Sequence, residues 1–144
     1  MISWYVGIVV YTPWKRPPPR NSVPGVERAK TLYKMWVPIH RDMARTERFG
    51  IGARIDFLCL ELLEITRKAT YAQAPDKIRL LAEALVKTDA LRFFLQLAWE
   101  TALIPNKHYI QIAQAVEEVG RMLGGWRKGL LSKTPPVSGR ERKE

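Results

Sequence analysis

The chain has 144 residues, the size of one ordinary domain, and leaves no room for two independent cores. Apolar residues make up 47%, which excludes a wholly disordered chain, and the single cysteine, Cys59, excludes a disulfide-rich secreted scaffold. No apolar run reaches the roughly 18 residues that a membrane-spanning helix requires. The sequence therefore predicts a soluble, basic, cytoplasmic protein of one domain.

The 24 Lys and Arg residues outnumber the 14 Asp and Glu residues, and most of this excess lies at the two ends of the chain. Residues 1–25 carry a net charge of +3 and residues 127–144 carry +4, whereas residues 26–126 hold 15 bases and 12 acids. Basic ends commonly act as electrostatic arms for polyanions, because released counterions supply the affinity. Together with the isoelectric point of the chain, which is near 10.0, the basic ends favour nucleic acid as the partner over a role in solubility alone.

Residues 1–25 are predicted to form an arm outside the main fold. The apolar stretch Met1–Thr12 lacks the basic start of a signal peptide, and it predicts a strand, a packed arm or a poorly ordered leader. As a strand it has no obvious partner in the chain, so it either pairs with another molecule or is disordered when alone. Five prolines between Pro13 and Pro24 then favour an extended linker. At the other end, residues 131–144 lack apolar periodicity and are predicted to be a disordered basic tail.

Residues 26–130 carry apolar side chains at helical spacing, and four helices are expected there. In the first, over 26–37, Pro38 is expected to kink or end the helix, with a second segment continuing to about residue 43. The others are expected over 51–71, 76–103 and 106–126. Four amphipathic helices with short connections predict an all-α, up-and-down four-helix bundle.

The helix expected over 51–71 has three features besides its main apolar stripe. Asp56 lies in an otherwise apolar stretch, and a structural ion pair with Arg54 or with another helix is favoured over a catalytic acid. Cys59 is expected to be a small buried core residue and not a nucleophile. Three more apolar residues widen the stripe and predict burial on more than one side: Phe57, Leu60 and Leu63.

No enzyme or metal site is indicated by the sequence. A di-iron site in a helical bundle needs Glu-x-x-His pairs, and the sequence has none, although Glu61 and Glu64 share the i, i+3 spacing. The glycines within Met122–Trp126 have neither the lysine nor the spacing of a phosphate-binding loop. The sequence therefore predicts a non-catalytic protein without a metal or cofactor.

The last predicted helix carries glycines that suit close contact with another helix. Gly120 and Gly124 are four residues apart, so they share one face and allow a neighbour to approach. Gly125 is also able to end the helix with a left-handed cap, but Trp126 keeps the apolar register, which favours continuation. Three tryptophans carry an indole N–H that suits a subunit or partner contact, with a plain core position as the alternative: Trp36, Trp99 and Trp126.

Basic residues on the arms and helix faces are the candidates for contact with nucleic acid. For any one of them a solvated exterior position is the alternative, and only their summed field favours binding. The candidates are Lys15, Arg16, Arg20, Arg67, Lys68, Lys77, Arg79, Lys87, Arg92, Arg127, Lys128 and Lys133.

Four segments carry a family resemblance: Lys30–Trp36, Gly52–Glu64, Asp89–Glu100 and Asn106–Trp126. Within them, LRFFLQLAWE and EEVGRMLGGW are the most specific stretches. The segments resemble the accessory variability determinant proteins of diversity-generating retroelements. These proteins are relatives of four-helix-bundle proteins encoded in intervening sequences of large-subunit ribosomal RNA genes. The apolar and Pro-rich leader departs from the pattern of this family.

The resemblance implies a bundle that assembles into a basic, barrel-like homopentamer, binds RNA and DNA, and associates with the reverse transcriptase of the retroelement. In this family the accessory protein supports mutagenic cDNA synthesis, while the polymerase site belongs to the transcriptase. The implied partners are therefore the transcriptase, template RNA and cDNA. A further hypothesis assigns the apolar leader, or the face of Gly120 and Gly124, to protein contacts. The alternative is an oligomeric scaffold of the ribosomal intervening-sequence type with no nucleic-acid role.

Overall fold

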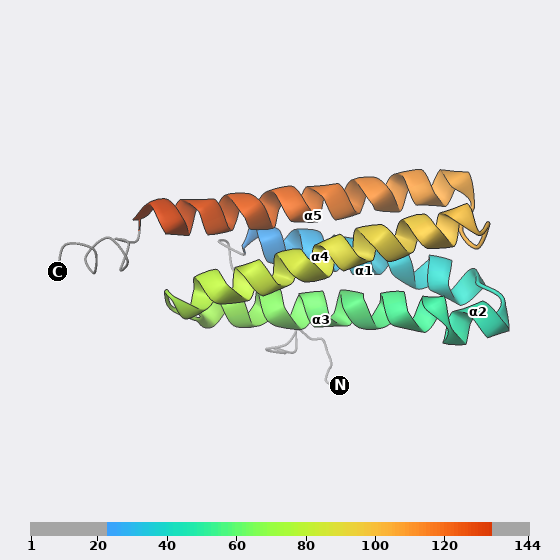
Figure 1. Cartoon of the computed structure of the whole chain (residues 1–144), viewed down its shortest axis with the longest axis horizontal. Coiled ribbons are helices and arrows are strands. Elements are labelled where there is room, and N and C mark those ends of the chain that lie inside the picture. Colours follow the sequence, from blue (N-terminus) through green and yellow to red (C-terminus); the bar gives the residue numbers. More distant parts are fainter. Residues whose placement is uncertain (1–22, 134–144) are drawn as a thin grey trace, which may run out of the picture.

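The computed structural model describes residues 23–133, which form four long helices and one short one (Figure 1). The long helices alternate in direction, and each packs on two others, in the cyclic order α1, α3, α4, α5. The predicted all-α four-helix bundle is confirmed. The elements are α1 (Pro24–Asp42), α2 (Arg45–Phe49), α3 (Ile51–Tyr71), α4 (Asp76–Glu100) and α5 (Asn106–Lys133).

The first and last helices are longer than predicted. Pro38 lies inside α1 and does not end it, since α1 continues to Asp42. The carbonyl that loses its partner belongs to Lys34, which is exposed, so water is able to satisfy it. At the other end, α5 continues through Trp126 to Lys133, as the apolar register of Trp126 indicated. The rest of the predicted arm and tail lies outside the described residues.

The helix α4 ends earlier than predicted, at Glu100, because the chain turns at Ala102. Ala102 has a φ of 63°, which is the left-handed conformation that often follows a helix end. The amide of Ala102 donates to the Trp99 carbonyl at 2.9 Å, and that of Leu103 donates to the Ala98 carbonyl at 2.8 Å. These bonds satisfy the carbonyls of Ala98 and Trp99 in the last turn of α4.

The core is built from one stripe of each long helix, and α3 buries a single face. Phe57 and Leu60 are about half exposed and Leu63 is partly buried, so the prediction that α3 is buried on more than one side is wrong. The reason is that, within residues 23–133, α3 has α1 and α4 as its long neighbours and no further helix packs on its outer side. The largest fully buried side chains include Leu32, Trp36, Ile55, Leu58, Leu62, Leu81, Leu91, Leu95, Ile112 and Leu123.

Asp56 ties α3 to α1. It accepts a hydrogen bond from Nε1 of the fully buried Trp36 at 3.2 Å, and Nδ1 of His40 lies 3.8 Å from the same carboxylate. The His40 ring stacks on Trp36 with 5.1 Å between centroids. The expected partner on another helix is thus confirmed, while Arg54 instead lies over the Phe94 ring. Because Trp36 is buried inside the protomer, its predicted role in a subunit contact is wrong.

Cys59 is buried in the core as expected. Burial, with the Asp56 charge as a smaller contribution, raises the pKa of its thiol to about 12. An unfolded thiol has a pKa of about 8.5, so the unfolded chain loses this proton first as the pH rises. The contribution of Cys59 to stability is therefore complete below about pH 8.5 and is lost progressively between that pH and about 12.

We expect the free energy of unfolding to fall more steeply with rising pH in the native chain than in Cys59→Ala. The extra slope is at most about 1.4 kcal/mol per pH unit in this alkaline range. Urea titrations of both proteins at about pH 8 and about pH 10.5 measure it. Parallel pH dependence in the two proteins would contradict the expectation.

No helix within residues 23–133 is long and apolar enough to span a bilayer.

Candidate nucleic-acid interface

The positive charge of the described residues gathers at one end of the bundle, where α1 begins, α3 turns into α4 and α5 ends (Figure 1). We call this region, residues 24–31, 64–80 and 124–133, the basic end. It holds nine bases and three acids, a net charge of +6. The rest of residues 23–133 holds nine bases and nine acids, so it contributes no net charge.

Ion pairs neutralise some bases of the basic end and leave others open. Arg67 pairs with Glu64 at 2.6 Å, and its hydrogen bond lowers the pKa of Glu64. Arg79 lies 3.6 Å from Asp76. Within the part of the chain that the structure describes, no acid lies at ion-pair distance from Lys68, Lys77, Arg127, Lys128 and Lys133. These five cations, all among the predicted candidates, carry charge that is unmatched by acids and able to attract phosphate oxygens; Lys68, Lys128 and Lys133 are exposed, and Lys77 and Arg127 are partly buried.

Trp126 joins three helices at the basic end. A Cβ placed on Gly25 of α1 would come within 3.2 Å of its ring, so the two helices approach closely there. Nζ of Lys77, on α4, lies over the same ring at 5.8 Å from its centroid, a cation–π contact. Trp126 is therefore engaged inside the protomer, where it holds Lys77 near the end of α5.

Lys87 and Arg92 lie midway along α4 and are not brought together with the other candidates. Lys87 pairs with Glu61 of α3 at 3.3 Å. Arg92 pairs with Glu117 of α5 at 2.6 Å and with Asp89 at 2.6 Å, and the hydrogen bonds that it donates to these carboxylates raise its pKa. Both side chains bridge helices, and their charges are already matched. The remaining candidates, Lys15, Arg16 and Arg20, lie outside the described residues.

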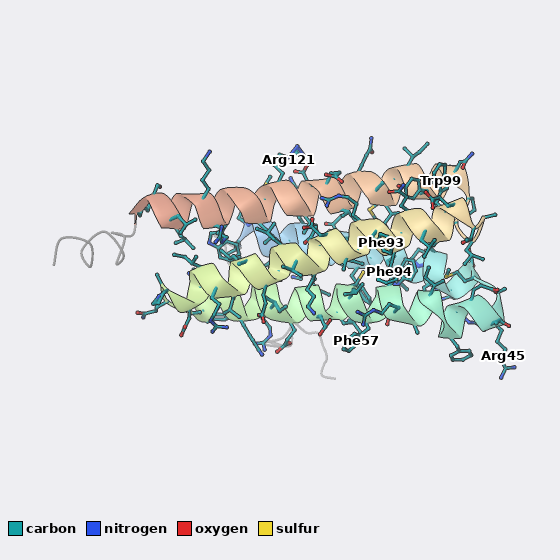
Figure 2. All side chains as sticks on the ribbon, viewed as in Figure 1. Arg45, Phe57, Phe93, Phe94, Trp99 and Arg121 are labelled. Atoms are coloured by element: carbon teal, nitrogen blue, oxygen red, sulfur yellow. The ribbon has the colours of Figure 1, made fainter. Side chains whose placement is uncertain are left out.

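Trp99 is the most exposed of the three tryptophans predicted to contact a partner, and it lies at the end opposite the basic end (Figure 2). Its ring stacks on Tyr109 with 4.8 Å between centroids, and Nε1 donates to Oδ1 of Asn106 at 2.5 Å. The local bonds orient the ring and leave about a third of the residue exposed. A partner contact through Trp99 stays a prediction.

The two glycines predicted to share a contact face differ in their surroundings. A Cβ on Gly120 would meet Arg92 and Thr88 at an ordinary 3.7 Å, whereas a Cβ on Gly124 would meet nothing within 4 Å. Among residues 23–133, then, no helix uses the small size of Gly124 for close approach. The Gly124 position is open to a contact from outside the described residues, while α4 already contacts the Gly120 position, so the shared contact face stays a prediction.

We expect Gly124→Ala to raise the free energy of unfolding by about 0.5–1 kcal/mol, because alanine favours the helix and has open space here. Gly52→Ala is the matched contrast: its Cβ would lie 2.8 Å from Cδ2 of His40 and 3.0 Å from the Glu47 carbonyl oxygen, so it should destabilise the chain by about 1–3 kcal/mol. Urea titration of both variants measures the change in the free energy of unfolding, which should have opposite signs in the two. Destabilisation by Gly124→Ala would show that a neighbour packs on that face.

The described residues offer little to a metal or a catalytic acid–base pair. Within residues 23–133, no three side chains of the His, Cys, Asp and Glu types are grouped as metal ligands. A pocket of about 420 Å³ lies at the end opposite the basic end, between α1 and the connection from α4 to α5. Its titratable lining residues are Asp42 and His108, among mostly apolar neighbours. The basic end is therefore the stronger candidate site.

The sequence model of the bAvd-like family matches residues 25–130, which include all of the bundle except the first residue of α1 and the last three of α5. The chain belongs to the bAvd-like family. The resemblance to the accessory variability determinant (Avd) proteins is thereby confirmed. The match to this bAvd-like model contains the basic end almost entirely and leaves the apolar leader outside it.

The fold of this bAvd-like chain is shared by a solved relative. A protein of unknown function from the S23 ribosomal protein family of Bacteroides thetaiotaomicron superposes with a TM-score of 0.67 at 20% sequence identity. The likeness covers 72% of this chain and 98% of that protein. At this identity it shows a common fold alone. No curated protein matches the chain.

Proposed function

We propose that this bAvd-like chain is a cytoplasmic, non-catalytic accessory protein of a diversity-generating retroelement. In this role it binds template RNA and cDNA, and it binds the reverse transcriptase of the element to support mutagenic reverse transcription. Membership of the family supports the link to the retroelement. The polymerase chemistry then belongs to the transcriptase, and the accessory protein holds and presents the nucleic acid.

The observation that carries nucleic-acid binding is the gathering of five open cations at the basic end. They come from α3, α4 and α5, and the two terminal segments add +3 from residues 1–22 and +1 from residues 134–144. Four of the five are lysines, which act as point charges toward phosphate and do not read base edges in a bidentate way. The binding we infer is therefore directed at the backbone of RNA or DNA and has little sequence preference.

We infer further that five copies assemble into a barrel-like homopentamer, as the family resemblance implies. Five times the charge of +10 gives +50, and such a charge repels itself unless a polyanion neutralises it. Assembly and RNA binding should therefore support each other. Trp99 and the face of Gly120 and Gly124 are the contacts that we propose for a subunit or the transcriptase.

Salt dependence tests the nucleic-acid part directly. For single-stranded RNA, each phosphate contact contributes about −0.7 to the slope of log affinity against log salt, so five contacts predict a slope of about −3.5. Affinity should fall by roughly 100-fold between about 50 and 200 mM salt. Fluorescence anisotropy with a labelled RNA measures this in the full chain. Affinity that does not change with salt would contradict the proposal.

The alternative is an oligomeric scaffold without a nucleic-acid role, and the shared fold with the S23-family protein is the observation that favours it. The two functions differ in one simple measurement. A correctly assembled protein that does not bind RNA at low salt, alone or with its transcriptase, would select the scaffold.

A further inference from the structure

A row of exposed apolar side chains runs along the outer sides of α3 and α4. Val86 and Phe93 on α4 are 64% and 62% exposed, and Phe57 on α3 is 52% exposed. Figure 2 shows Phe57 and Phe93 at the same level of the bundle, on neighbouring helices. We call the five residues of this row the outer face: Phe57, Leu60, Val86, Phe93 and Leu97.

The outer face is large enough to be a docking surface. Two phenylalanines and three aliphatic side chains, each 36–64% exposed, together expose on the order of 400 Å². A contiguous patch of a few hundred Å² on a soluble protein is commonly functional. The exposed area of the outer face is about half of the roughly 800 Å² that each partner buries in a standard interface. This area suits a short segment better than a whole second protein.

The charges around the outer face do not favour nucleic acid as its occupant. Residues 51–63 and 81–100, the parts of α3 and α4 that carry the face, hold three bases and five acids. Lys87 pairs with Glu61 and Arg92 pairs with Asp89, and these pairs cancel. Arg54, which lies over Phe94, is then outnumbered by Asp56, Glu83 and Glu100. This side of a protein with a net charge of +10 is therefore apolar and acidic. Its occupant should be apolar and basic.

The N-terminal segment of the chain has this chemistry. Residues 1–14 hold isoleucines, valines, tyrosines and tryptophans, and Lys15, Arg16 and Arg20 follow without any acid before Glu27. The segment also lies outside the family match, which begins at residue 25, so no part of the family bundle is built from it. The outer face is thus apolar, acidic and exposed in the described bundle. The segment before residue 25 is apolar and basic, and it lies outside the family match.

The reach of the chain allows the segment to meet the α3 part of the outer face. The bond from Trp36 to Asp56 and the approach of His40 to Gly52 set α1 and α3 in antiparallel register. In this register Pro24 lies level with about residue 68, and Leu60 and Phe57 lie about 12–17 Å further along the bundle. Residues 13–22 join the apolar stretch to the described residues, and in extended form these ten residues span about 31 Å.

We propose that residues 1–12 dock on the outer face of their own bundle. The apolar side chains of the segment cover Phe57, Phe93 and their neighbours, and the basic residues that follow lie beside the acids of α3 and α4. The Pro-rich stretch then runs from the outer face back to the start of α1. This inference does not rest on the proposed function, and RNA binding at the basic end is measured separately.

Disulfide trapping in the full chain tests the docking. Val6→Cys is combined with Val86→Cys on the outer face, and the control combines Val6→Cys with Ile110→Cys, an equally exposed site on α5. Native Cys59 does not interfere, because it is buried. We expect oxidation to form the Val6–Val86 link within one chain at least tenfold faster than the control link. Equal rates in the two pairs, or links formed only between chains, would overturn the proposal.

Protection from protease gives an independent readout. Chymotrypsin cleaves after exposed aromatic residues, and Trp4, Tyr5 and Tyr11 lie in the segment. We expect the double change Phe57→Asp and Phe93→Asp to speed cleavage in the segment at least tenfold, while Phe49→Asp, an exposed site on α2, leaves the rate unchanged. Circular dichroism confirms that the variants stay helical. Cleavage that is equally fast in all proteins would refute the docking.

Discussion

Replacing Lys68, Lys128 and Lys133 together by alanine is expected to weaken RNA binding by about 100-fold at low salt. All three are exposed, lie at the basic end and have no ion-pair partner within residues 23–133. If each contact with phosphate contributes roughly 1 kcal/mol, three contacts amount to two orders of magnitude in affinity. The slope of log affinity against log salt should also become shallower by about 2. Anisotropy titrations over a range of salt concentrations measure both effects.

The chain offers a matched control for this triple variant. Lys34, Arg45 and Lys107 are also exposed and have no ion-pair partner within residues 23–133, but they lie outside the basic end. Figure 2 shows Arg45 at the opposite end of the bundle. Their replacement by alanine removes the same total charge and should weaken binding by less than about fivefold, through the long-range field alone. Equal losses in the two triple variants would refute the basic end as the binding site.

Asp56→Ala is expected to lower the free energy of unfolding by about 2–3 kcal/mol. The change leaves the indole N–H of buried Trp36 without its acceptor and removes the carboxylate beside His40. A buried donor without a partner costs about 1–3 kcal/mol. For a domain of about 100 residues, this loss corresponds to a fall in Tm of roughly 10–15 °C. Thermal and urea unfolding, followed by circular dichroism, measure it.

Two companion variants show whether the loss comes from the bond between Trp36 and Asp56. Glu83→Ala removes an exposed acid on α4 that has no ion-pair partner in the described part of the chain, and it should change stability by less than about 0.5 kcal/mol. In Trp36→Phe the donor is already absent, so adding Asp56→Ala should cost clearly less than it does in the native chain. Additive losses in this cycle would mean that the bond contributes nothing.

The sequence was sufficient to predict the helical core, because burial there follows local periodicity. Helix α3 occupies Ile51–Tyr71 as predicted, and Cys59 and Leu62 are buried. It was not sufficient to predict the exposure of Phe57 and Leu60. Apolar spacing reports how wide a stripe is, but the number of helices that cover it depends on the arrangement of the whole bundle.

The candidate site shows the same division between local and long-range information. The sequence identifies the unpaired cations of the basic end as candidates. It does not show that they lie close together, because that depends on the antiparallel order that brings residues 64–80 to the same end of the bundle as the end of α5. Lys87 and Arg92 look equivalent to Lys77 in the sequence. Their pairing with Glu61 and Glu117 depends on the register between helices, which sequence spacing does not report.

The one-sided charge of the bundle gives the molecule a large electric dipole along its length, with a neutral body behind a cationic tip. A polyanion nearby should therefore turn the protein before contact, so that the tip arrives first. In a ring with rotational symmetry, every subunit has the same orientation relative to the axis. If the bundles stand along that axis, all the tips lie on one rim, and RNA meets a ring with one attractive side.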